Sequence, residues 1–188
     1  DDFDCWLICP IKIIGDHTEK YVQGYFHYDS KKSGGLTVSH LRFGDTPIRS
    51  TYLIEHADYV ACHTPAYLHT YDLLKGLKKG GTFLLNTTWS QEQILKNLPK
   101  KMKRYLAENE IRFYTINAMQ LAMEVGLGGR INTAMETAFF YLANIIPTEE
   151  IMPILKEEAL KSYRHKSMAI VEKNQAAIDR TIELLQEI

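Results

Sequence analysis

A lysine and glycine segment, Asp29–Gly35 (DSKKSGG), is the first part of the chain whose residue types suggest binding chemistry. Lysines beside glycines let ammonium groups and backbone N–H groups approach an anion together, so the segment could be a phosphate-binding turn. Basic residues followed by two glycines are equally typical of a helix C-terminus. Taken alone, the pattern favours the helix ending, because a short motif without structural context is weak evidence for a site.

A second glycine-rich segment, Gly126–Arg130 (GLGGR), leads into a strongly apolar stretch that begins at Ile131. Glycines before a helix N-terminus can form an anion-binding turn. The spacing is not GxGxxG, however, and the segment does not follow the first strand, where a dinucleotide fingerprint belongs. Glycine here could also allow a close approach to a sheet. Asn132 could be a ligand-binding amide or simply an N-cap residue.

Asn174 is a polar residue on an otherwise apolar helical stripe formed by Val171, Ile178, Ile182 and Leu185. A buried amide needs a hydrogen-bond partner. The partner could be a backbone group, which is the commoner case, a neighbouring subunit or a ligand.

The sequence contains no recognisable catalytic or metal-binding motif. Its seven histidines form neither HExxH nor a zinc-finger spacing, and adjacent residues such as Cys62 and His63 on a strand point to opposite faces. No GxSxG motif is present, and Cys62 fits a small core residue better than a nucleophile. We therefore expect no catalytic residue and no metal site in this chain.

Short strands and helices alternate along the chain, and this pattern predicts the fold class. Apolar runs predict strands at 36–42, 58–63, 82–86 and 111–116, and amphipathic patterns predict helices at 13–31, 65–78, 90–98 and 99–109. Ser90 and Gln93 form a capping box at the start of one of these helices. Alternating elements with continuous apolar strands favour an α/β, Rossmann-like three-layer domain with a mainly parallel sheet.

The last third is helical. Residues 131–146 are strongly apolar and predict a buried helix, with Thr133 and Glu136 as a possible capping pair. Residues 148–163 and 166–188 are amphipathic and carry no strand signal. We expect one domain over 1–188, with an α/β core over about 1–146 and a helical C-terminal extension over about 148–188.

Composition and charge narrow the class of protein. The 188 residues are 45% hydrophobic and 24% charged, as in soluble globular proteins, and no apolar run is long enough for a membrane helix. A net charge of -1 gives no general attraction to nucleic acid or anionic lipid. Three scattered cysteines and an acidic start indicate a reducing, cytoplasmic location without a signal peptide.

Several motifs together closely resemble the gamma-type domain of pyruvate:ferredoxin (flavodoxin) oxidoreductases, members of the 2-oxoacid oxidoreductase family. The resemblance extends from about residue 11 to the C-terminal helix. The motifs, in chain order, are IIGD at 13–16, GYF at 24–26, YDSKKSGG at 28–35, LTVSHLRFG at 36–44, ADYVACH at 57–63, GGTFLLN at 80–86 and GLGGRIN at 126–132.

The resemblance implies a CoA-handling domain that is not catalytic alone. In the parent enzymes, pyruvate is oxidatively decarboxylated to acetyl-CoA with thiamine diphosphate, and iron–sulfur clusters pass electrons to ferredoxin or flavodoxin. Those cofactors belong to other domains or subunits, which would be the partners of this chain. The resemblance implies that CoA is contacted by a glycine-rich loop near the first strand and by three residues that correspond here to Lys32, Asn132 and Asn174.

One departure from the family pattern lies at the N-terminus. The family runs from its first strand through a loop of the type GLGxDGTVGANK, whereas here Trp6–Pro10 leads directly into Ile11. Without that loop a structural interface module that has lost ligand binding becomes the alternative function. A free-standing nucleotide-dependent enzyme is a third possible function, which the missing dinucleotide fingerprint disfavours.

Overall fold

The computed structural model describes the backbone of residues 5–28, 36–50 and 53–188. Contacts between Cα atoms divide the chain into two compact units, Asp1–Glu55 and His56–Ile188. Each unit has its own sheet.

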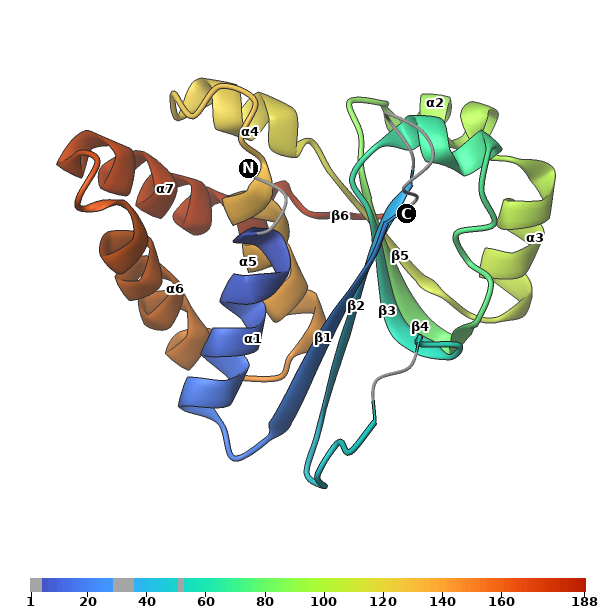
Figure 1. Cartoon of the computed structure of the whole chain (residues 1–188). Helices are drawn as coiled ribbons and strands as arrows, with labels where there is room; N and C mark the ends of the chain where they lie inside the picture. The colour runs from blue at the N-terminus through green and yellow to red at the C-terminus, as the bar shows by residue number, and fades with distance from the viewer. Residues whose placement is uncertain (1–4, 29–35, 51–52) are drawn as a thin grey trace. The chain divides into compact units, whose positions relative to one another are not determined.

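The first unit consists of a helix and an antiparallel hairpin. Helix α1 (Cys5–His17) is followed by β1 (Tyr21–Tyr28) and β2 (Thr37–Gly44), which pair from Tyr21↔Gly44 to Tyr28↔Thr37. Helix α1 lies along one face of this hairpin (Figure 1), and its Ile13 and Ile14 side chains are buried.

The helix predicted over 13–31 is therefore wrong from Thr18 to Tyr28, and residues 29–31 lie outside the described part of the chain. Tyr21, Val22, Tyr25, Phe26 and Tyr28 also fit a helical stripe, but their aromatic and β-branched side chains favour a strand. The helix ends at His17, and the Thr18 hydroxyl donates a hydrogen bond to the carbonyl of Ile14 at 2.5 Å. The strand predicted over 36–42 corresponds to β2.

The second unit contains a four-stranded sheet in the order β3-β4-β5-β6. Strands β3 (Ala57–Cys62), β4 (Leu77–Asn86) and β5 (Arg112–Ile116) are parallel. The short strand β6 (Gln186–Glu187) joins antiparallel to β5. A mainly parallel sheet in an α/β fold is thus confirmed, and β6 is an element that the sequence pattern did not indicate.

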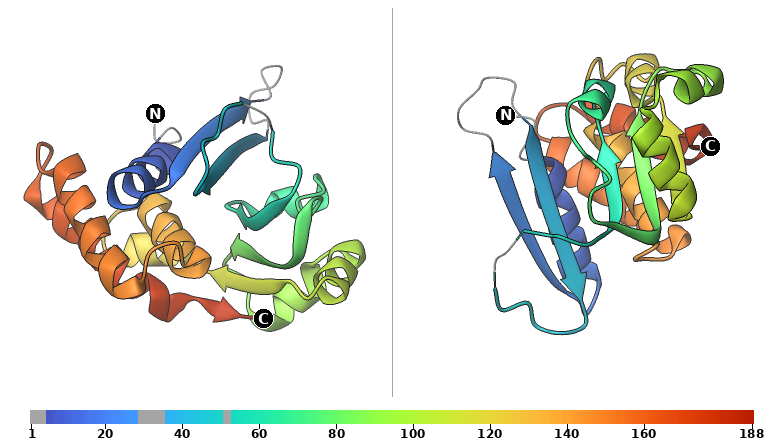
Figure 2. Two further views of the ribbon diagram at one scale, coloured as in Figure 1. Left: turned by 90° about the horizontal axis from the view of Figure 1, so that it is seen from below. Right: turned by 90° about the vertical axis from the view of Figure 1, so that its right-hand side faces the viewer.

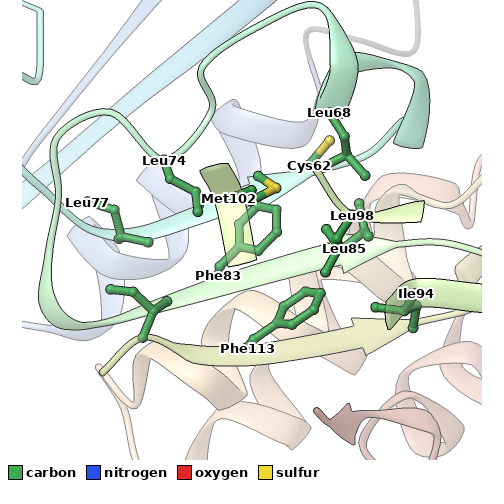
Figure 3. Packing of buried hydrophobic residues seen from close by; sticks show 11 residues of the cluster. Cys62, Leu68, Leu74, Leu77, Phe83, Leu85, Ile94, Leu98, Met102 and Phe113 are labelled. Carbon is green, nitrogen blue, oxygen red and sulfur yellow. The ribbon is translucent and has the colours of Figure 1, made fainter. Parts of the chain in front are cut away.

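Helices cover both faces of this sheet and make the predicted three layers (Figures 1 and 2). Helices α2 (Gln91–Asn97) and α3 (Lys100–Glu108) lie on one face, close to their predicted positions. The capping box of Ser90 and Gln93 is present. Residues from both helices and the strands form one apolar core (Figure 3), which includes Cys62, Phe83, Ile94, Met102 and Phe113.

The opposite face is covered by the C-terminal helices. Helix α5 (Asn132–Ala143) buries Met135, Ala138 and Phe140 among other residues, which confirms the predicted apolar helix. It packs against α6 (Thr148–Tyr163) and α7 (Met168–Thr181). The 3₁₀ helix η2 (Ile182–Leu184) follows α7, and the additional helix α4 (Ala118–Glu124) was not predicted.

The helix predicted over 65–78 is absent. A 3₁₀ helix, η1 (Pro65–His69), is followed by turns, and β4 begins at Leu77. Leu68 in η1, Leu74 in the following turn and Leu77 at the start of β4 are all buried in the core. Their helix-like spacing therefore comes from three separate elements that contact the same core. The residues Lys78–Gly81 form an irregular part of β4, where Ala57 pairs with Leu77 and Tyr59 with Thr82.

No helix within residues 5–28, 36–50 and 53–188 combines the length and apolar character that crossing a membrane requires.

Candidate functional site

The glycine-rich segment after α4 is a helix ending. The Gly126 N–H donates to the Met123 carbonyl at 3.1 Å, and the Leu127 N–H donates to the Ala122 carbonyl at 2.7 Å. These two bonds and the positive φ of Gly126 (80°) define a Schellman motif, in which Leu127 packs near Ala122. A Cβ on Gly126 would also lie 3.1 Å from Cε of Lys173. The glycines therefore shape the turn that delivers the chain to α5.

Asn132 is the first residue of α5, and Ile131 occupies the N-cap position. The N-cap interpretation of Asn132 is therefore wrong. Its side chain is partly buried rather than enclosed. Because Asn132 begins the helix, its side-chain amide lies next to backbone N–H groups that have no carbonyl partner within the helix.

Asn174 lies in the middle of α7 and is only 3% exposed. Its Nδ2 donates to the Ile170 carbonyl at 2.8 Å, and its Oδ1 accepts from the Thr133 hydroxyl at 2.6 Å. A backbone partner was one of the three predicted possibilities. The bond from Thr133 was not predicted. Thr133 is the second residue of α5 and Ile131 occupies the N-cap position, so Thr133 is not the expected N-terminal cap.

The structure thus brings Asn132 and Asn174 into one neighbourhood, because Thr133 follows Asn132 directly and bonds to Asn174. Lys32 lies outside the described residues, and so does the whole segment 29–35. The described element before that segment is a strand, β1, rather than the predicted helix.

A second polar arrangement connects the carboxyl ends of the parallel strands. Asn86, which ends β4, donates to the His63 carbonyl at 3.0 Å and accepts from the Ala118 N–H at 3.0 Å. It therefore joins the ends of β3 and β4 to the start of α4. Sequence reasoning missed Asn86, although a polar residue that ends a predicted apolar strand is a usable signal.

Burial shifts the pKa values of two titratable side chains at the end of β3, Cys62 and His63. Burial lowers the pKa of His63 to about 4, which keeps its imidazole neutral. Burial also raises the pKa of the Cys62 thiol, partly opposed by a hydrogen bond with the backbone of Thr64. The thiol itself donates a hydrogen bond to the Thr64 carbonyl at 3.2 Å. A buried, protonated thiol is a weak nucleophile, so Cys62 fits the predicted core role.

No group of three or more His, Cys, Asp or Glu side chains in the described part of the chain is arranged to hold a metal ion. Asn132, Thr133 and Asn174 offer directional hydrogen bonds from neutral groups. Such groups suit the recognition of a polar ligand.

Comparison with known proteins identifies relatives of this chain. The family described as pyruvate ferredoxin/flavodoxin oxidoreductase matches residues 11–184. The pyruvate:ferredoxin oxidoreductase of Moorella thermoacetica is 55% identical over 178 residues, which cover 95% of this chain and 15% of that protein. The chain therefore spans only about one seventh of this relative's length.

Solved structures share the fold. The pyruvate oxidoreductase subunit PORC of Thermotoga maritima superposes with a TM-score of 0.74 at 19% identity, covering 97% of this chain and 89% of that one. A 2-oxoglutarate:ferredoxin oxidoreductase of Magnetococcus marinus, solved with 2-oxoglutarate, coenzyme A and succinyl-CoA bound, gives a TM-score of 0.57 at 18% identity. It covers 87% of this chain and 25% of that one.

Proposed function

Because the chain belongs to the pyruvate ferredoxin/flavodoxin oxidoreductase family, we propose that it binds CoA and docks on the other domains or subunits of a 2-oxoacid oxidoreductase. The parent reaction would be the oxidative decarboxylation of pyruvate to acetyl-CoA. Thiamine diphosphate and the iron–sulfur clusters would be held by those partners, and ferredoxin or flavodoxin would accept the electrons in the cytoplasm.

The observation that carries this proposal is that Asn132, in the first turn of α5, lies in the same neighbourhood as Asn174 in α7. The two residues are far apart in sequence, yet the Thr133–Asn174 hydrogen bond joins their helices. The resemblance assigns CoA contacts to the same two asparagines. CoA bound in the Magnetococcus marinus enzyme, which shares the fold, is a further support for this choice of ligand.

The role of this chain would be positional. A bound CoA whose amide and phosphate groups are held by neutral amides and a lysine keeps its thiol in a fixed place. Lys32 would supply a charge to a CoA phosphate, because a lysine ammonium acts as a mobile point charge. The asparagines would supply the directional hydrogen bonds.

Calorimetric titration of the chain with CoA, with NAD as the comparison ligand, tests the proposal. We expect CoA to bind and NAD not to bind, and Asn132→Ala to weaken CoA three- to tenfold through loss of a neutral hydrogen bond. Asn97→Ala is the matched control, because Asn97 ends α2 on the opposite face of the sheet. The affinity of the Asn97→Ala variant for CoA should equal that of the wild type.

Two results would contradict the proposal. Absence of CoA binding at millimolar concentration favours the structural interface module. Binding of NAD in preference to CoA favours the free-standing nucleotide-dependent enzyme.

A further inference from the structure

The amide of Asn174 is held at both of its ends. The Ile170 carbonyl can only accept a hydrogen bond, so the nitrogen of the amide must face it, at 2.8 Å. The Thr133 hydroxyl donates to the oxygen of the amide at 2.6 Å. One N–H of Asn174 is left without a partner among the described residues.

That remaining N–H has a consequence for binding. Asn174 is almost completely buried, and a buried donor without a partner destabilises the folded state. An acceptor atom of a ligand that reached this N–H would recover the lost hydrogen bond. The orientation of the amide therefore decides whether a donor or an acceptor is presented.

Thr133 differs from two other helical threonines of this chain, Thr137 and Thr181, in where its hydroxyl points. The hydroxyls of Thr137 and Thr181 donate to the carbonyl four residues earlier in their own helices, at 2.8 Å each. Thr133 is the second residue of α5 and has no helical carbonyl four residues before it. Its hydroxyl is consequently available for α7.

We propose that Thr133 is a positioning residue for CoA binding, which fixes the Asn174 amide with its free N–H available to CoA. The inference rests on the proposed function. The same hydrogen bond holds the first turn of α5, which carries Asn132, against α7, which carries Asn174. Thr133 thus sets both the orientation of the Asn174 amide and the distance between Asn132 and Asn174.

Three substitutions separate the hydroxyl from the shape of the side chain. Thr133→Val removes the hydroxyl and keeps the branched shape, Thr133→Ser keeps the hydroxyl, and Thr137→Val removes a neighbouring buried hydroxyl that bonds within α5. Each variant of the full chain is titrated calorimetrically with CoA, and its thermal unfolding is recorded. We expect Thr133→Val to weaken CoA binding about tenfold, and the other two to stay within threefold of the wild type.

Two further measurements separate positioning from general damage. Adding Thr133→Val to Asn174→Ala should cause no further loss of affinity if Thr133 acts through Asn174. The side-chain NH₂ signals of Asn174 in a ¹⁵N–¹H NMR spectrum of the wild type should shift when CoA is added. This measurement remains decisive even if Thr133→Val does not fold.

The outcomes distinguish the two proposals. If the wild type does not bind CoA, the proposed function fails and the role of Thr133 fails with it. If the wild type binds CoA but Thr133→Val binds equally well, or the Asn174 NH₂ signals do not respond to CoA, the positioning role alone is overturned.

Discussion

At the scale of single residues, the ionisation of the His63 side chain is coupled to folding. It follows β3 and is linked through its carbonyl to Asn86. Burial holds its folded-state pKa at about 4, whereas an imidazole in an unfolded chain has a pKa of about 6.5. Between these two values the unfolded state binds a proton that the folded state does not.

Stability should therefore fall as pH falls through the window from 6.5 to 4, and change little from this source above it. Lowering the pH from 7.5 to 5.0 should remove about 2 kcal/mol of unfolding free energy through His63. Urea unfolding at the two pH values measures this loss. His63→Gln should show a loss smaller by about that amount.

Some pH dependence should remain in His63→Gln. Burial lowers the pKa of His40 as well, with smaller contributions from His27 and Arg42, and its effect on stability has the same sign. An unchanged pH dependence in His63→Gln would show that His63 is not protected from protonation.

At the scale of elements, the diglycine in β4 has a steric role that its sequence pattern concealed. The helix predicted over 65–78 would end at this diglycine, but Lys78–Gly81 is the irregular part of β4 opposite β3. A Cβ on Gly81 would lie 2.8 Å from the Lys78 carbonyl oxygen and 3.1 Å from the Asp58 carbonyl oxygen. Both neighbours are backbone atoms, which cannot rotate away as a flexible side chain can.

Gly81→Ala should therefore cost roughly 2 kcal/mol of unfolding free energy, in the range seen for overpacked sites. Gly80→Ala should cost about 1 kcal/mol, because Gly80 has a positive φ (73°) but open space around its Cα. Gly129→Ala, with open space and an exposed position, is the control and should change stability by less than about 0.5 kcal/mol. Equal losses for Gly80 and Gly81, measured by urea unfolding, would contradict the steric explanation.

The same elements show what sequence patterns can and cannot determine. The strands 58–63, 82–86 and 111–116 were predicted well, because parallel strands buried on both faces are continuous apolar runs. Residues 18–28 and 65–78 were misassigned, because aromatic or leucine spacing that fits a helix also fits strand and loop residues that reach a core. The two-residue β6 is too short to leave a pattern.

The candidate site was predictable to a similar degree. Asn174 stood out as a polar residue on an apolar stripe, and the structure buries it as that pattern requires. Its partner Thr133 lies 41 residues away. A side-chain hydrogen bond between two helices has no local signal, so only the packing of α5 against α7 could reveal it.

At the scale of the whole molecule, charge determines how an anionic ligand such as CoA could be recognised. The net charge is -1, so the chain has no general attraction to the phosphates of CoA. Any salt-sensitive part of the affinity must then come from a few local cations. The resemblance assigns this role to Lys32, and the adjacent Lys31 has the same charge.

Lys32→Ala should therefore weaken CoA binding roughly tenfold or more, as expected for a hydrogen bond to a charged group. It should also reduce the salt dependence of the remaining affinity, because one screened ion contact is gone. Calorimetric titrations at low and moderate salt measure both effects. Lys31→Ala is the matched control, with the same loss of charge one residue away. Equal effects of the two substitutions would indicate general attraction by a basic segment rather than a specific contact of Lys32 with a phosphate.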